Sequence, residues 1–122
     1  MKREEYTSMV DMLISATLDK KIKWEEEANS FSTAIGGCNL KLTSSYDFTV
    51  NASSYSLELF NRDGELFEAF SYSEDVDEVN FQQLDRLYNV IRDIKLKISE
   101  SEKYIMEGLK KLINPFDDGL PF

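Results

Sequence analysis

The alternation of apolar and polar residues between Phe31 and Tyr72 constrains the fold more than any other feature of this sequence. Side chains that recur with a period of two lie on one face of a β-strand. Two turn signals divide the run. Gly36-Gly37 tolerates positive φ at both positions, and residues 61–64 read Asn-Arg-Asp-Gly. Each signal predicts a hairpin, and together they predict four or five antiparallel strands with one face covered.

The segment at 46–50 leaves the number of strands open. Tyr46, Phe48 and Val50 continue the alternating phase of the strand that begins after Gly37. They form either a fifth short strand or the continuation of a long, bent one.

Helical periodicity flanks the alternating region on both sides. Residues 3–20 have apolar side chains at steps of three and four, which predicts an amphipathic helix: Tyr6, Met9, Val10, Leu13, Ile14 and Leu18. A second helix is predicted to begin at Asn80, with Gln83 as its capping-box partner and a hydrophobic staple between Val79 and Leu84. The sequence therefore predicts a single α+β domain over residues 1–113, with helices covering one face of an antiparallel meander.

A heptad repeat runs through the second helical region. Apolar residues recur every seven positions, at Leu84, Ile91, Ile98, Ile105 and Leu112. An unbroken helix over 81–113 would be about 50 Å long, whereas a domain of this size is about 35 Å across. Two outcomes stay open. The helix turns back near Ser99 as a helical hairpin, with Glu102 completing a new capping box, or its far half packs on a second subunit, with the heptad residues forming a homodimer seam.

Composition excludes several classes of protein. The chain has no histidine, which removes histidine-dependent catalysis. Its single cysteine, Cys38, lies in phase with the predicted core and has no base beside it, so neither a disulfide nor a structural zinc is expected. We expect no enzyme activity, no cofactor and no metal site. The longest uncharged stretch, 28–40, is short and polar, and acids at positions 4 and 5 argue against a signal peptide, so we expect a cytoplasmic protein without a membrane span.

Charge is distributed unevenly along the chain. Fourteen basic and 23 acidic residues give a net charge of −9, and residues 46–78 alone hold nine acids and one base. Such a surface repels phosphate, which disfavours broad binding of nucleic acid. The sequence Lys20-Lys21-Ile22-Lys23-Trp24 is a basic exception. It could contact a nucleic-acid backbone, and a helix C-terminus stabilised by Lys, followed by a Trp that covers the core, explains it equally well.

Two alternative functions follow from the strands and the charge. Aromatic residues on the predicted strands could stack on unpaired bases and give weak binding of single-stranded DNA, although core packing explains most of them: Tyr46, Phe48, Tyr55, Phe60, Phe67, Phe70 and Tyr72. In the other alternative, the acidic segment imitates DNA phosphates and inhibits a nuclease or defence enzyme. The acids that would matter there are Glu65, Glu68, Asp75 and Asp77.

The last nine residues, 114–122, form a separate acidic tail. Asn114-Pro115 ends the helix, and the sequence continues Phe-Asp-Asp-Gly-Leu-Pro-Phe. A terminal Phe presents a ring and a carboxylate to one pocket, and the preceding Pro lowers the cost of ordering them. The alternative is that the apolar tail residues fold back onto the protein's own core. We expect partner contacts from Phe116, Asp117, Asp118, Leu120, Pro121 and Phe122.

This tail resembles the acidic C-terminal tip of bacterial single-stranded DNA-binding proteins. The matching residues are Asp117, Asp118, Leu120, Pro121 and Phe122. Gly119 departs from the pattern, and the long linker of that family is missing. The resemblance implies binding to host replication, recombination and repair proteins, which have an apolar pocket rimmed by basic residues. It predicts a non-enzymatic adaptor of DNA metabolism, of the kind that a phage or mobile element could encode.

Overall fold

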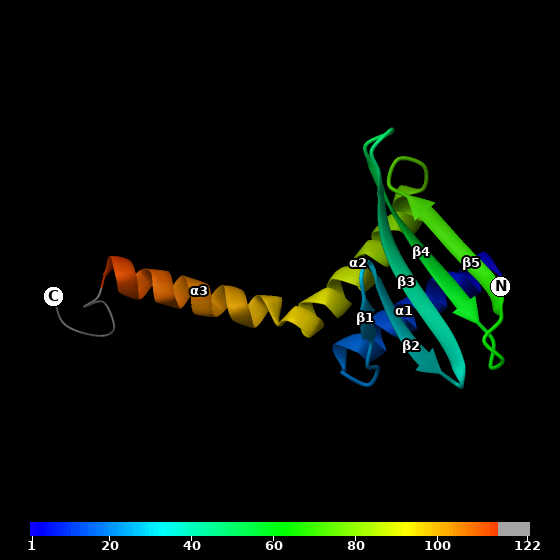
Figure 1. Ribbon diagram of the computed structural model, residues 1–122, viewed down its shortest axis with the longest axis horizontal. Helices are drawn as coiled ribbons and strands as arrows, with labels where there is room; N and C mark the ends of the chain where they lie inside the picture. Colours follow the sequence, from blue (N-terminus) through cyan, green and yellow to red (C-terminus); the bar gives the residue numbers. More distant parts are fainter. Residues whose placement is uncertain (115–122) are drawn as a thin grey trace. The chain divides into compact units, whose positions relative to one another are not determined.

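The computed structural model describes residues 1–114 of the chain (Figure 1). Within these residues, an N-terminal helix is followed by five strands and two helices, which confirms the α+β class. The elements are α1 Arg3–Leu18, β1 Glu25–Glu27, β2 Ser30–Ile35, β3 Cys38–Asp47, β4 Ala52–Phe60, β5 Leu66–Ser73, α2 Glu78–Leu96 and α3 Ile98–Ile113. Residues 1–91 form one compact unit, called the body below, and the residues from Arg92 onward form a second.

The strands form one antiparallel sheet in the order β1-β2-β3-β4-β5. Both predicted hairpins are present. Gly36 and Gly37 have positive φ and close the turn between β2 and β3. The side chain of Asn61 organises the turn between β4 and β5, because its oxygen accepts hydrogen bonds from the backbone N–H groups of Asp63 and Glu65. Each turn is built by residues that predicted it.

The fifth strand is not at the predicted position. β3 runs unbroken to Asp47 and includes Tyr46, so the alternative of one long strand is correct. Phe48 and Val50 lie in the turn that follows. The additional strand is β1, which consists of three glutamates and pairs with β2. Charged side chains on an edge strand hinder pairing with another sheet, and they give no apolar alternation from which a strand could be predicted.

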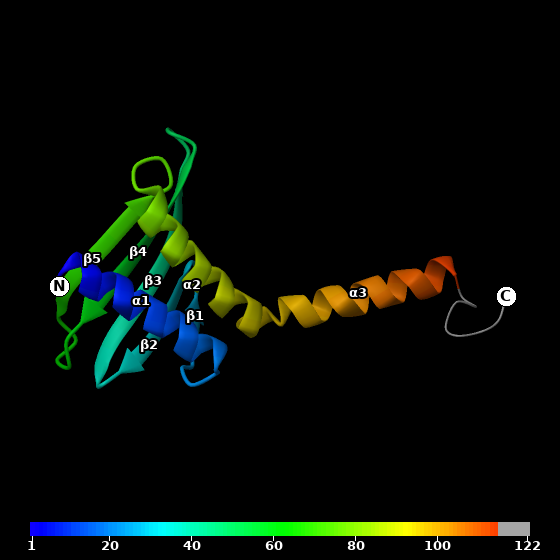
Figure 2. The same ribbon diagram turned by 180° about the vertical axis from the view of Figure 1, so that it is seen from behind.

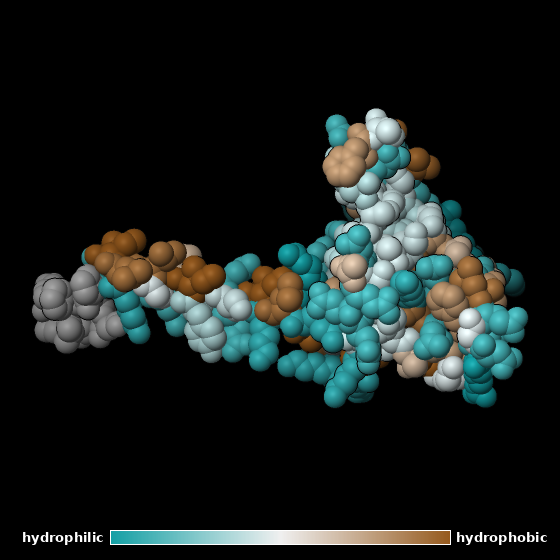
Figure 3. Space-filling view, in the orientation of Figure 1, coloured by the Kyte–Doolittle hydropathy of each residue, from teal (hydrophilic) through white to brown (hydrophobic). Residues whose placement is uncertain are grey.

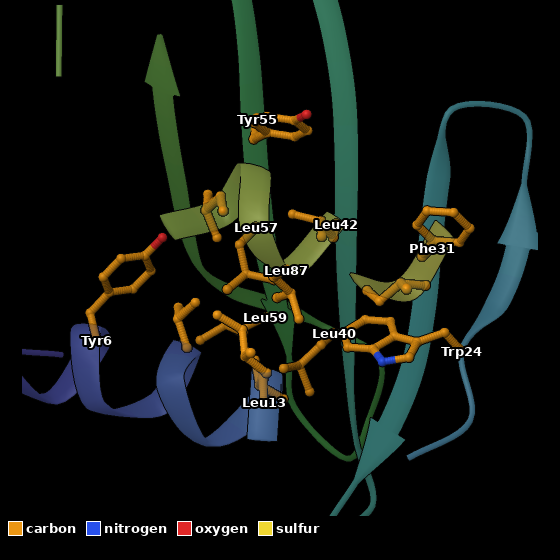
Figure 4. Packing of buried hydrophobic residues seen from close by; sticks show 14 of the residues in the cluster. Tyr6, Leu13, Trp24, Phe31, Leu40, Leu42, Tyr55, Leu57, Leu59 and Leu87 are labelled. Carbon is orange, nitrogen blue, oxygen red and sulfur yellow. The ribbon is translucent and has the colours of Figure 1, made fainter. Parts of the chain in front are cut away.

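Two helices cover one face of the sheet and leave the other face open. Figure 2 shows α1 and α2 in front of the strands, and Figure 1 shows the opposite, uncovered face. In the core, Leu40, Leu57 and Leu59 of the sheet meet Leu13 of α1 and Leu87 of α2 (Figure 4). Burying one leucine side chain contributes about 1.5–3 kcal/mol, so this cluster is the main source of stability in the body.

α2 begins earlier than predicted, at Glu78, and Asp77 takes the cap position. The Asp77 carboxylate accepts hydrogen bonds from the side chain of Asn80 at 2.9 Å and from its backbone N–H at 3.3 Å. These bonds lower the pKa of Asp77. Gln83 donates to a backbone carbonyl and a carboxylate of α1, and Val79 is exposed. The predicted capping box and staple are therefore wrong, since an acid three residues before Asn80 caps the helix instead.

The helix with the heptad repeat is interrupted at Lys97, whose backbone is left-handed with φ 51° and ψ 45°. Asp93 bridges the interruption, because its carboxylate accepts hydrogen bonds from the backbone N–H and the hydroxyl of Ser99, both at 2.9 Å. The predicted interruption near Ser99 is thus present, at Lys97. The predicted capping box is wrong, since Ser99 bonds back to Asp93 and lies inside the first turn of α3.

Two of the five heptad residues are used inside the body. Leu84 and Ile91 are at most 1% exposed and belong to the core cluster. They are unavailable to a second subunit, so the predicted seam through all five residues is wrong in that part. Ile98, Ile105 and Leu112 lie in α3, and a seam through these three stays a prediction.

Candidate functional site

The residues predicted to bind a partner lie outside the described part of the chain: Phe116, Asp117, Asp118, Leu120, Pro121 and Phe122. The described chain leads directly to them. α3 ends at Ile113, and the backbone N–H of Asn114 still bonds to the carbonyl of Lys110 at 2.8 Å. The tail hypothesis therefore depends on the sequence of this segment, which follows the last turn of α3 after two residues.

α3 presents an exposed apolar side just before the tail. Helical spacing places six apolar residues on this side: Ile98, Ile105, Met106, Leu109, Leu112 and Ile113. The last five of them are 45–80% exposed, and no residue of α3 is buried. Figure 3 shows hydrophobic side chains gathered along one side of this helix. The helix also has three acidic and three basic residues, and so no net charge, in a strongly acidic protein.

The strand aromatics do not form one platform for stacking bases. Tyr55 is buried, and Phe70 and Tyr72 pack against the core, as the core-packing interpretation predicted. The other four are exposed or half-buried: Tyr46, Phe48, Phe60 and Phe67. Tyr46 and Phe48 lie at the end of β3 and in the turn after it, whereas Phe60 and Phe67 lie beside the turn between β4 and β5. The nine-residue strand β4 separates the two groups by about 30 Å. These rings cannot act together on a few neighbouring bases.

An array of hydroxyl side chains covers the open face of the sheet. One row is in register across four strands: Ser30, Thr43, Ser56 and Ser71. A second row lies beside it: Ser45, Ser54 and Ser73. Three cross-strand pairs of these hydroxyls are hydrogen-bonded at 2.7–3.0 Å, and Figure 3 shows a surface of intermediate hydropathy, drawn pale, along β3 and β4. Ser or Thr at every second position, opposite the core residues, is the sequence pattern from which this array can be predicted.

The acids proposed to imitate DNA are divided between the two ends of β5. Glu65 and Glu68 lie at its start, and Asp75 and Asp77 follow its end. An eight-residue strand spans about 26 Å, so the structure does not bring these four side chains together. The acids after β5 also have local roles, since Asp75 accepts a hydrogen bond from Ser73 and Asp77 caps α2. Among residues 1–114, no group of three or more acidic or cysteine side chains is placed to hold a metal ion.

A groove of about 1150 Å³ opens in the body beside α1. Most of its lining is apolar and includes Met9, Met12, Leu13, Ile22, Ile35, Leu40 and Phe67. Its charged lining residues are Lys20, Lys21, Lys23 and Glu25, which gives the rim a positive charge in an acidic protein. No sequence pattern predicts this groove, because its walls come from segments that are far apart along the chain. We call it the lysine-rimmed groove.

The way α1 ends positions the lysine rim. The backbone N–H of Lys21 donates to the carbonyl oxygen of Ala16 at 2.9 Å. The backbone N–H of Lys20 donates to the carbonyl oxygen of Thr17 at 3.0 Å. With a φ of 58° at Lys20, this is a Schellman motif, in which glycine is the usual left-handed residue. Trp24 then returns the chain to the core, where it is buried. The interpretation of this basic stretch as a helix end followed by a core Trp is confirmed.

Comparison with known proteins gives no relative: no family model, no curated protein and no solved structure matches the chain. Within residues 1–114, no helix combines the length and the apolar character that crossing a bilayer requires.

Proposed function

We propose that this protein is a non-enzymatic adaptor of DNA replication, recombination or repair, which binds host proteins through its acidic tail. The observation that carries the proposal is the sequence of residues 117–122, Asp-Asp-Gly-Leu-Pro-Phe, and its resemblance to the tip of bacterial single-stranded DNA-binding proteins. The partner's site is an apolar pocket rimmed by basic side chains, which takes the Phe122 ring and pairs with the acids before it. The cytoplasm is the matching compartment, and a phage or mobile element is a matching source.

The energetics of such a tail favour weak, salt-dependent binding. Burying one Phe ring contributes about 1.5–3 kcal/mol, whereas micromolar affinity needs about 8 kcal/mol. Asp117, Asp118 and Leu120 must supply much of the difference, partly through charge. Charge attraction at an exposed site weakens as salt is added. The exposed apolar side of α3, a helix that ends at Ile113 immediately before the tail, offers additional surface to the same partner.

The described surfaces give little support to the two alternative functions, binding of single-stranded DNA and imitation of DNA. Binding of single-stranded DNA needs stacking rings beside a basic groove, but the open sheet face carries paired hydroxyls, and the exposed aromatics near the strand ends lie far apart. Imitation of DNA needs closely spaced acids, whereas Glu65 and Asp75 lie at opposite ends of β5. Neither alternative is favoured by a specific contact.

We retain a homodimer as part of the proposal, with α3 as its interface. Ile98, Ile105 and Leu112 keep the heptad spacing. A helix of 16 residues is marginal in water unless its apolar side is covered. Because α3 has no net charge, two copies of it can pair without the repulsion that the acidic body would cause.

Affinity capture from a bacterial lysate tests whether the tail binds replication and repair proteins. The immobilised full chain is compared with a chain lacking Phe122 and with a Phe48→Ala variant. Phe48 is 84% exposed at the β3–β4 turn, so its loss removes a solvent-exposed ring without changing the tail. We expect replication and repair proteins on the intact chain and on the Phe48→Ala variant, and their loss when Phe122 is removed. Identical capture by all three chains would refute the proposal.

A further inference from the structure

The lysine-rimmed groove belongs entirely to the body, since its lining residues fall between Met1 and Phe67. Three leucines of the buried core also line it: Leu13, Leu40 and Leu59. Figure 4 shows these three side chains close together. Met12, in the wall that α1 provides, is 63% exposed. The groove is therefore an apolar surface that continues from the core and is open to solvent.

Positive charge gathers in this groove where α1 ends. Lys20, Lys21 and Lys23 line it there, against one acidic side chain, Glu25. Among the described residues, none of the three ammonium groups forms an ion pair. Lys20 also keeps a left-handed backbone, with φ 58°, and strain of this kind is concentrated at binding sites. An anionic group is therefore attracted to this end of the groove, although the chain has a net charge of −9.

The apolar part of the groove favours a ligand without hydrogen-bonding groups. The hydroxyl and amide side chains in its lining are those of Ser32, Thr33 and Asn39. The Thr33 hydroxyl is already engaged, because it donates a 2.8 Å hydrogen bond to the carbonyl of Lys23. A peptide has an N–H and a C=O at nearly every residue, and most of these groups would lose water here without gaining a partner. An alkyl chain has no such groups and loses nothing on burial.

The dimensions of the groove suit one alkyl chain with its head group. The wall that runs along α1 from Met9 to Ala16 is about 10 Å long, and the lysines follow directly after it. The volume of about 1150 Å³ is slightly larger than the range of about 300–1,000 Å³ that is typical of small-molecule sites. The groove can therefore cover the chain while the head group stays at the lysines.

We infer that the lysine-rimmed groove binds a fatty acid as its carboxylate. The alkyl chain lies along α1 over the leucine floor, and the carboxylate pairs with Lys20, Lys21 and Lys23. This inference goes beyond the proposed function, because it involves no residue after Phe67 and no partner protein. It gives the body a ligand of its own, separate from whatever the tail recruits.

Isothermal titration calorimetry of the full chain with dodecanoate, kept below the concentration at which it forms micelles, measures the affinity. Decanoate, which is shorter by two methylenes, should bind up to about fifteenfold more weakly. Dodecyltrimethylammonium has the same alkyl chain and a positive head, and it should bind more weakly than dodecanoate at low salt. Equal affinity for the two dodecyl ligands would overturn the inference, since the lysines would then play no part in binding.

Lysine variants test the pairing with the carboxylate. Lys21→Gln combined with Lys23→Gln should weaken dodecanoate binding by about two- to thirtyfold at low salt, and added salt should reduce this difference. Lys103→Gln combined with Lys110→Gln is the matched control, because it removes the same charge from exposed positions on α3. It should bind dodecanoate as the wild type does. Equal weakening by the two pairs would contradict a role for the groove lysines.

Cys38 reports whether the ligand lies in the groove. It is the single cysteine of the chain, it is half-buried, and it lines the groove. Its rate of alkylation by the neutral reagent iodoacetamide should fall in proportion to the fraction of protein that has bound dodecanoate. Met12→Glu should weaken this protection, whereas Leu18→Glu should preserve it, because Leu18 is 53% exposed on the same helix but outside the lining. Unchanged reactivity of Cys38 at saturating dodecanoate would overturn the inference.

Other occupants give different results in the same assay. Protection of Cys38 by anionic vesicles alone, or by an acidic peptide alone, would assign the groove to a membrane or to a protein and would refute the fatty-acid ligand. Absence of dodecanoate binding with partner capture intact would refute this inference alone. Loss of partner capture with dodecanoate binding intact would refute the proposed function alone.

Discussion

The indole N–H of Trp24 donates a 3.0 Å hydrogen bond to the hydroxyl of Thr17, seven residues earlier, and both side chains are buried. The Thr17 hydroxyl donates in turn to the carbonyl of Leu13 at 2.6 Å. This relay fastens the loop that carries the lysine rim to the last turns of α1. The rim is therefore held by the core of the body, although its charged ends face solvent.

Replacing Thr17 with Val removes the relay at nearly constant volume. The buried Trp24 N–H then loses its acceptor, which should cost about 1–3 kcal/mol of unfolding free energy. Urea denaturation at neutral pH measures this loss. Thr7→Val is the matched control, since Thr7 is exposed on the same helix, and it should leave the midpoint nearly unchanged. Equal midpoints for the two variants would contradict the role of the relay.

Lys20 occupies a left-handed position that favours glycine, with a φ of 58°. Lys20→Gly should therefore raise the unfolding free energy by about 1 kcal/mol, because glycine adopts this conformation without a Cβ penalty. Lys21→Gly at the neighbouring ordinary position should lower it by about 0.5–1 kcal/mol. Thermal or urea unfolding of both variants checks the opposite signs. A destabilised Lys20→Gly chain would argue against the Schellman motif.

The burial of Tyr6 should make the stability of the fold sensitive to alkaline pH. Its side chain is 1% exposed, and its hydroxyl has no hydrogen-bond partner among the described residues. Burial raises the pKa of Tyr6, and the nearby Tyr72 and Asp77 raise it further. The folded protein keeps the neutral phenol while the unfolded chain ionises near pH 10. The stability linked to Tyr6 is thus complete below about pH 10 and is lost as the pH rises beyond it.

Tyr6→Phe should remove this sensitivity. At neutral pH the variant should be as stable as the wild type or more stable by about 1 kcal/mol, because an unpaired buried hydroxyl is removed. Above about pH 10 its stability should fall less steeply. A residual fall is expected, since burial also raises the pKa of Tyr72. Urea unfolding across the alkaline range, with the exposed Tyr104→Phe as control, measures the slopes. Parallel curves for Tyr6→Phe and the wild type would contradict the assignment.

The homodimer hypothesis predicts that α3 sets the oligomeric state. Ile105→Glu combined with Leu112→Glu places charges on the apolar side of α3 and should convert a dimer to a monomer in sedimentation equilibrium. The control pair Lys103→Gln and Lys110→Gln alters the polar side and should preserve the dimer. A wild-type chain that stays monomeric across a dilution series would rule out the interface.

Local sequence signals predicted most of the sheet but missed features that depend on context. Gly36-Gly37 and Asn61 impose their turns through backbone conformation and side-chain acceptance, so both hairpins could be predicted. The β1 strand could not, because three glutamates have no apolar alternation. The start of α2 was ambiguous, since Asp77 and Asn80 are both good caps and only the folded chain selects between them.

Some of the candidate sites could likewise be predicted from local sequence, whereas others depend on the fold. The tail is a contiguous motif, so its residues could be named from the sequence, although they lie outside the described structure. The hydroxyl array can be predicted from the alternating Ser and Thr residues only when the strand register is known. The lysine-rimmed groove could not be predicted, because Met12, Lys21 and Ile35 come together only through folding.

Competition for a tail-binding pocket tests directly whether the tail of this protein binds a repair protein. A fluorescent peptide with the C-terminal sequence of a bacterial single-stranded DNA-binding protein is bound to a repair protein that recognises it, and the full chain is titrated in while anisotropy is followed. We expect the wild type and Phe48→Ala to displace the peptide with an affinity on the order of micromolar that weakens with salt. We expect no displacement by Phe122→Ala. Failure of the wild type to displace the peptide, or equal displacement by Phe122→Ala, would contradict binding through the tail.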